Sequence, residues 1–243
     1  MSDLPHPPEE PKRLSKVVAA LVPCSRREAE QYIVEGRVRV DGKVVDEPQA
    51  RVAKEHVEVD SRAALAPPAP ATFLLHKPPR LDTAGAQALL AAANQWKDDA
   101  SGIRRVKSHA VGLVALLPLP FPAEGLSVFS QDARIVRKLQ EEAQLVEQEL
   151  LAEVTGTIAP NGLARLGRGL VFEGRALPTA RVSWQSEARL RIAGKGLALE
   201  LMPWMCEQVG LGLVSLKRLR IGRVPMAGVP AGQWRYLPTG ERF

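Results

Sequence analysis

A short uncharged stretch divides the chain and limits what it can fold into. Residues 63–71 are AALAPPAPA, with three prolines and no helical or strand periodicity. Such a composition favours an extended, semi-rigid spacer. We therefore predict a small domain over residues 12–62, a linker over 63–71 and a larger domain over 72–243. Residues 1–11 offer too little apolar surface to order themselves and are expected to form a disordered arm.

Composition then excludes several classes of protein. The chain has 243 residues, 45% of them hydrophobic, which fits one or two globular domains rather than a collagenous or wholly disordered protein. Cys24 and Cys206 lie far apart without a CxxC partner, so we expect neither a disulfide framework nor a metal site. No apolar run is long enough for a membrane span, and the N-terminal residues lack a signal peptide pattern. We expect a cytoplasmic protein whose net charge of +6 permits an anionic partner.

The small domain has clear local signals. Apolar residues recur at helical spacing over residues 14–21. Ser25 and Glu28 form a capping box for a second helix, and Gly36 is placed to end it in a left-handed conformation. The period then changes to two, with Asp41-Gly42 as a hairpin turn, and a closing strand follows at residues 56–60. The predicted order is helix, helix, hairpin, strand.

This run resembles the small RNA-binding domain first described in ribosomal small-subunit protein four. The SRREAE helix start, the EGRVRVDGK turn and the spacing between them carry the resemblance, over Arg13 to about Asp60. It implies that the second helix and the hairpin present basic side chains to RNA backbone. Arginines near a helix N-terminus attract phosphate, although solvated charges balanced by nearby acids are the alternative. The candidate RNA-binding residues are Arg26, Arg27, Arg37, Arg39 and Lys43.

The larger domain mixes strands and helices without a regular βαβ alternation. This pattern predicts an α+β fold built on a mostly antiparallel sheet. Helices are expected over 84–96, over 132–146 and at a short segment from Pro203. Strands are expected around residues 73–75, 150–155, 181–184, 190–193, 197–202 and 214–221.

Several strings in this domain resemble the RsuA, RluB and RluF type of bacterial RNA pseudouridine synthases. They include LLHKP, EGLSVFSQD, EQELLAEVTG and, above all, VSLKRLRIGRVPMAGVPAGQWRYLPTGE. The resemblance implies an isomerase that uses no cofactor or metal, extrudes a uridine from folded RNA and rejoins its base through carbon. It also implies RNA as the partner and favours structured ribosomal RNA, but the sequence leaves transfer RNA or another RNA open and does not indicate which helix or loop is bound.

The residues that should carry this chemistry are missing. The family's nucleophilic aspartate ends a Gly-Arg-Leu-Asp string, four residues before the position of Glu124. The aspartate position is therefore Pro120 and the arginine position Pro118, and proline cannot ionise. The family's Lys-x-Tyr, whose tyrosine stacks on the base, falls at Gln148 and Leu150. We expect a pocket with no ionised acid, cation or aromatic ring.

A second basic string of the family is also lost. The segment that grips RNA in the family corresponds to Gly196 through Met205, and no Lys or Arg occurs over residues 197–209. The apolar residues from Leu197 to Val209 could form a contact surface for a protein partner, or could simply be core. Lys217 and Arg218 are further RNA-binding candidates, in a basic string that also contains Arg220 and Arg223. They could equally form the solvent-exposed face of an ordinary strand.

Other polar residues could in principle replace the aspartate. Asp82 ends an Arg-Leu-Asp string, but it precedes an Ala-rich helix, so a capping role is the alternative to a displaced nucleophile. Asp132 is expected to cap a helix, and His76 and His109 lack a carboxylate or thiol companion at fixed spacing. The sequence thus favours an RNA-binding relative without activity, and leaves open an active isomerase with a displaced carboxylate.

Overall fold

The computed structural model describes residues 10–22, 24–60 and 69–243. It divides into two compact units, Met1–Ala69 with Arg104–Val111, and Pro70–Ile103 with Gly112–Phe243. Most of the predicted arm and linker lies outside the described residues. Residues 104–111 were predicted to belong to the larger domain, whereas the structure groups them with the first unit. These residues contact the first unit, where Lys107 Nζ lies 3.3 Å from Asp46 Oδ1.

The first unit has the predicted order of elements. Helix α1 (Leu14–Leu21) packs against α2 (Arg26–Val34), and the sheet order is β3 (Lys43–Val44), β2 (Val38–Val40), β5 (Val57–Val59). A further pair, β1 (Lys12–Arg13) and β4 (Arg51–Val52), was not predicted. The capping box is confirmed, because Ser25 N donates to Glu28 Oε2 at 2.7 Å and Glu28 N donates to Ser25 Oγ at 3.2 Å. Gly36 has a φ of 64°, as its role at the helix end requires.

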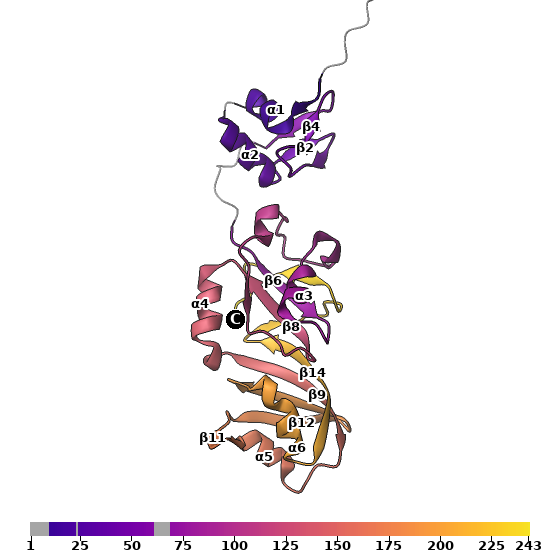
Figure 1. Ribbon diagram of the computed structural model, residues 1–243, viewed down its shortest axis with the longest axis vertical. Coiled ribbons are helices and arrows are strands. Elements are labelled where there is room, and N and C mark those ends of the chain that lie inside the picture. The colour runs from indigo at the N-terminus through magenta and orange to yellow at the C-terminus, as the bar shows by residue number, and fades with distance from the viewer. Residues whose placement is uncertain (1–9, 23, 61–68) are drawn as a thin grey trace, which may run out of the picture. The chain divides into compact units, whose positions relative to one another are not determined.

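The second unit is built on one nine-stranded sheet (Figure 1). Its order is β12 (Ala180–Ser186), β13 (Arg189–Lys195), β9 (Glu147–Gly156), β14 (Leu211–Ile221), β8 (Glu124–Ser130), β6 (Thr72–Lys77) and β16 (Trp234–Tyr236). Two short strands, β7 (Val114–Leu116) and β15 (Val224–Pro225), pair with β8 and β14. Only the β14–β8 pair of these is parallel, so the mixed α+β architecture with a mostly antiparallel sheet is confirmed.

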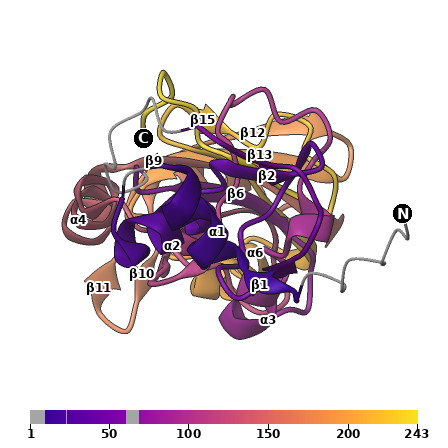
Figure 2. The same ribbon diagram turned by 90° about the horizontal axis from the view of Figure 1, so that it is seen from above.

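Helices cover this sheet at separate places. Helix α4 (Ala133–Glu141) packs over β7 and β8, and α6 (Met202–Glu207) packs over β14. Figure 2 shows α6 to one side of β12 and β13. The apolar cluster there contains Leu150, Leu190 and Met202, and extends to α5 (Gly162–Arg168) through Leu166. Separate apolar clusters lie around Leu139 and Phe73.

Two predicted elements of the second unit are wrong. The helix expected over residues 84–96 is shortened to α3 (Thr83–Ala88) and a single turn, η1 (Ala92–Asn94). The strand expected at residues 197–202 is instead η4 (Leu199–Leu201) leading into α6. The alternating apolar residues of this segment belong to short helical turns that pack against the core, because tertiary packing outweighs a weak local preference for a strand. No helix of the described residues is long and apolar enough to cross a membrane.

Candidate active site

The loop between β7 and β8 holds the position expected for the nucleophile. Its residues 117–123 are LPLPFPA. Leu117 adopts a φ of 47°, an uncommon conformation for a residue with a side chain. If Pro120 takes the aspartate position of the Gly-Arg-Leu-Asp string, Leu117 takes its glycine position. The left-handed backbone of Leu117 agrees with this alignment. The structure thus has a proline, buried from solvent, at that position.

A buried arginine is hydrogen-bonded to this loop. Arg218 is only 1% exposed. Its Nη2 donates to the carbonyl oxygen of Leu117 at 2.7 Å, its Nε to the carbonyl oxygen of Leu126 at 2.8 Å, and its Nη1 to Gln148 Oε1 at 3.0 Å. These acceptors are all neutral oxygens. Burial lowers the pKa of Arg218 to about 9, because the charged guanidinium has lost water without gaining an anion.

A buried lysine is hydrogen-bonded to the same loop. Lys77 is 2% exposed, and its Nζ donates to the carbonyl oxygens of Leu81 at 2.7 Å, Pro78 at 3.0 Å and Phe121 at 3.4 Å. Burial, followed by the charge of Arg218, lowers the pKa of Lys77. The expectation of a pocket without cations is therefore wrong. Two cations are present, and backbone carbonyl groups and the Gln148 side chain accept their hydrogen bonds.

Apolar side chains fill the space between Glu124 and Leu150. Leu119, Ala123 and Leu150 belong to one buried cluster, and Leu150 is completely buried. Leu197, Leu199 and Met202 from the opposite layer complete the same cluster. Leu150 stands where the family's stacking tyrosine would stand, but here it is part of the core. The residues expected to line a cleft thus belong to a buried apolar cluster.

One carboxylate lies at the end of the loop. Glu124 Oε1 is 3.1 Å from Lys217 Nζ, and both side chains are 28% exposed. His76 is close to this pair, with Nδ1 2.7 Å from the carbonyl oxygen of Val229, and burial lowers its pKa. His76 Nε2 is buried without a hydrogen-bond partner among the described residues. Glu124 is a possible acid that no sequence motif indicates.

The other candidate acids cap helices. Asp82 is exposed, and its Oδ1 accepts a hydrogen bond from Gly85 N at 2.7 Å, at the start of α3. Asp132 Oδ1 accepts from Arg134 N at 2.9 Å at the start of α4, and the Arg134 side chain holds the pKa of Asp132 below its usual range. His109 is buried in a turn, Lys107–Ala110, and burial lowers its pKa. These placements match the structural roles that the sequence analysis gave as alternatives.

The RNA-binding candidates of the first unit have different surroundings. Arg26 and Arg27 are exposed in the first turn of α2, and Arg39 and Lys43 are exposed on the hairpin. Arg37 instead forms an ion pair with buried Glu35, with 2.7 Å between Nε and Oε2. The role of these residues in RNA binding stays a prediction.

Two expectations for the second unit need correction. Lys217 and Arg218 do not share a wet face, because Arg218 points into the core and cannot reach a phosphate. Adjacent residues of a strand point to opposite faces, and a register shift between Arg218 and Arg220 then turns Arg220 to the face opposite Arg218. The segment from Leu197 to Val209 is not an exposed protein-binding surface either. Its side chains are largely buried, with Val209 at 0% and Met202 at 1% exposure.

Comparison with known proteins identifies both parts of the chain. The S4 domain model matches residues 12–57. The dual-specificity RNA pseudouridine synthase RluF of Salmonella typhi is 27% identical over 234 residues, covering 94% of this chain and 76% of that protein. The ribosomal large subunit pseudouridine synthase B of Bacillus subtilis (strain 168) is 26% identical over 237 residues, covering 95% of this chain and 93% of that protein.

A solved pseudouridylate synthase has the same fold. It aligns with a TM-score of 0.58 and 17% sequence identity, covering 93% of this chain and 95% of that chain. The chain therefore carries an S4 domain and is homologous, over most of its length, to RNA pseudouridine synthases of the RluF and RsuA type.

Proposed function

We propose that this protein binds structured ribosomal RNA without isomerising uridine. The observation that carries the proposal is the surroundings of Arg218. A cation of this kind would hold a catalytic carboxylate ionised and oriented. Here each of its three nitrogens donates to a neutral oxygen, of Leu117, Leu126 or Gln148, and Pro120 occupies the aspartate position. The filled space around Leu150 supports the same conclusion, since a flipped base needs a pocket.

RNA binding is supported by the S4 domain and by what the relatives are named for. The exposed arginines at the start of α2 lie at a helix N-terminus, whose dipole favours phosphate. Ribosomal RNA is the proposed partner because the Bacillus subtilis relative is named as a ribosomal large subunit enzyme.

A second candidate is an active synthase with a displaced carboxylate. The names of the relatives favour it, and Glu124 with its Lys217 partner is better placed for it than Asp82, which caps a helix. In this version Glu124 would attack or deprotonate the sugar from the end of the loop.

Tritium release separates the two candidates. Ribosomal RNA transcribed with 5-tritiated uridine is incubated with the wild-type protein, and with the Bacillus subtilis relative as a positive control. We expect release only from the control. Release by the wild-type protein that is lost in Glu124→Gln or in Asp82→Ala would contradict the proposal and identify the acid.

RNA binding is tested separately by fluorescence anisotropy with a labelled ribosomal RNA transcript. We expect Arg26→Ala with Arg27→Ala to weaken binding by about tenfold or more. The matched control is Lys16→Ala with Lys54→Ala, which removes the same charge from exposed positions outside α2 and the hairpin. Equal losses in the two variants would show that the helix start is not the contact surface.

A further inference from the structure

The sheet has a polar groove on the face opposite the filled site. It has a volume of about 260 Å³ and lies over β12, β13, β9 and β14. Its lining consists of Glu149, Arg181, Ser183, Arg191, Ala193 and Arg220. Glu149 and Leu150 are neighbours in β9 and point to opposite faces, so this groove is separate from the space around Leu150.

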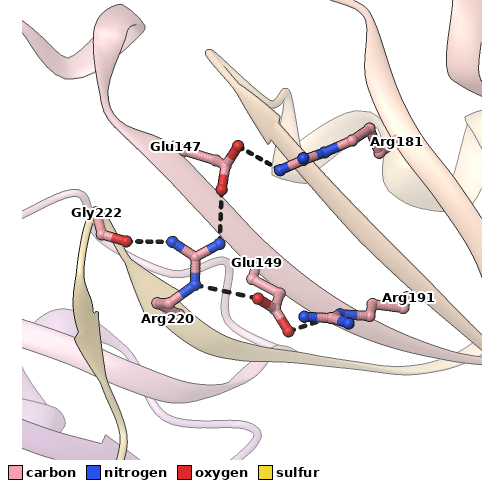
Figure 3. Close-up of polar contacts among 6 residues, drawn as sticks. All are labelled: Glu147, Glu149, Arg181, Arg191, Arg220 and Gly222. Atoms are coloured by element: carbon pink, nitrogen blue, oxygen red, sulfur yellow. Dashed lines mark hydrogen bonds and ion pairs between the residues drawn. The ribbon is translucent and has the colours of Figure 1, made fainter.

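The charged side chains form one continuous network (Figure 3). Arg220 lies in the middle, with Nη2 2.6 Å from Glu147 Oε1, Nε 3.1 Å from Glu149 Oε2, and Nη1 bonded to the carbonyl oxygen of Gly222. Arg181 Nη2 is 2.7 Å from Glu147 Oε2, and Arg191 Nε is 2.8 Å from Glu149 Oε1. Each carboxylate thus binds two arginines, one through each of its oxygens.

This network has an excess of positive charge where it meets solvent. Three guanidinium groups face two carboxylates, and the hydrogen bonds from Arg220 and Arg191 lower the pKa values of Glu147 and Glu149, respectively, so both stay ionised. Arg220 is enclosed by its partners, whereas the side chains of Arg181 and Arg191 are 78% and 55% exposed. Each of these two uses one nitrogen in the network, which leaves further donors available to a ligand.

The two outer arginines are arranged as a pair. Ser183 is two residues from Arg181 in β12 and lies opposite Arg191 in β13. Each arginine donates one hydrogen bond to its glutamate, which restricts the directions that the guanidinium can take before any ligand binds. A fixed guanidinium recognises a phosphate better than a mobile one, because less side-chain entropy is lost.

We propose that this groove binds the phosphate backbone of RNA, as a second contact surface in addition to the S4 domain. The inference rests on the proposed RNA-binding function and adds a site to it. Arg181 and Arg191 would each donate to a phosphate oxygen, and the Ser183 hydroxyl would donate a third hydrogen bond. The glutamates position the arginines and do not contact the phosphate.

The test compares two double variants of equal charge by fluorescence anisotropy. Arg181→Gln with Arg191→Gln removes the outer arginines of the groove. Arg175→Gln with Arg189→Gln is the control, because both of these arginines are exposed in the same unit and neither lines the groove. We expect the groove variant to bind a labelled ribosomal RNA transcript about tenfold more weakly and to lower the slope of log affinity against log salt by about one to two, with little change in the control.

A second measurement covers the case in which the groove variant unfolds. Ultraviolet cross-linking of wild-type protein to the same transcript, followed by mass spectrometry, is expected to yield RNA adducts on the peptides that contain residues 181–191. Arg181→Lys with Arg191→Lys keeps the charge but loses the planar guanidinium with its several N–H donors, and should give an intermediate affinity.

The outcomes distinguish this inference from the proposed function. Equal affinities of the groove and control variants, with no adducts at residues 181–191, would overturn the groove as an RNA site. If Arg26→Ala with Arg27→Ala still weakened binding, RNA binding through the S4 domain would stand. A wild-type protein that binds no RNA would overturn both proposals. Displacement of the transcript from the wild-type protein by inorganic phosphate at constant ionic strength would support the recognition of phosphate groups.

Discussion

Two arginines of β14 illustrate how differently the two faces of the sheet are built. Arg218 is buried, and its hydrogen bonds go to Leu117, Leu126 and Gln148, all through neutral oxygens. Arg220, two residues later, is bound by Glu147 and Glu149. The pKa of Arg218 falls to about 9 through burial, whereas the pKa of Arg220 rises, chiefly through its bond to Glu147. The same residue type is thus a cation without an anion on one face and part of an ion-pair network on the other.

The difference bears on the proposal that the candidate site has no isomerase activity. In a working site of this kind we expect the buried arginine, not the surface one, to have the carboxylate partner. Here Arg218 donates to the loop carbonyl of Leu117, to the carbonyl of Leu126 in β8 and to the side chain of Gln148, and Leu119 and Leu150 belong to a buried apolar cluster. The charged chemistry of the sheet lies on the opposite face, in the groove around Arg220.

Truncating the two arginines should therefore have unequal effects on stability. Arg218→Ala leaves a cavity and three buried acceptors without a donor, so we expect the free energy of unfolding to fall by about 3–5 kcal/mol. Arg220→Ala acts on a partly exposed network and should cost about 1 kcal/mol. All four tryptophans, Trp96, Trp184, Trp204 and Trp234, lie in the second unit, so urea unfolding followed by tryptophan fluorescence reports on that unit. Equal losses would mean that the two faces are energetically alike.

The loop itself offers a narrower comparison. Leu119 is buried in the cluster around Leu150, whereas Phe121 is 57% exposed. We expect Leu119→Ala to lower the free energy of unfolding by about 2–3 kcal/mol and Phe121→Ala to change it by less than about 0.5 kcal/mol. The same fluorescence measurement applies. A small effect of Leu119→Ala would show that the space beside Pro120 is open and could admit a base.

The smallest expected effect concerns pH. The pKa values of Glu147 and Glu149 are lowered in the folded protein, so these groups stabilise it above the unfolded value of about 4.3, and this contribution is lost as the pH falls through the lower folded values. Wild type should exceed Glu147→Gln with Glu149→Gln in stability at pH 7, and the gap should narrow at pH values of about 3 and below. A gap that stays constant across this range would show that the network does not depend on ionised carboxylates.

Local signals predicted the first unit well. The Ser25–Glu28 capping box and the Asp41-Gly42 turn act over a few residues, so the sequence contains all that is needed to place them. The contact of residues 104–111 with this unit could not be predicted, because it joins Lys107 to Asp46 across a long stretch of chain. No local pattern encodes such a contact.

The contents of the candidate site could be predicted only in part. The count from Glu124 placed prolines where an aspartate and an arginine were expected, and Leu117 in a left-handed conformation agrees with that count. The burial of Arg218 beside the loop was missed, because Lys217 and Arg218 were grouped on one solvent-exposed face, although adjacent residues of a strand point to opposite faces. A register shift of one residue reverses the face of every side chain that follows it.

By itself the sequence determined which chemical groups this protein has at its disposal: an S4 domain with exposed arginines, and a synthase-like domain with proline at the nucleophile position. Only the tertiary structure decided to which face of the sheet each charged side chain of β14 points. Side-chain direction in a strand depends on the register with its neighbours, and a bulge is set by packing across the whole sheet. For this reason Arg218 ends in the core and Arg220 beside an open groove.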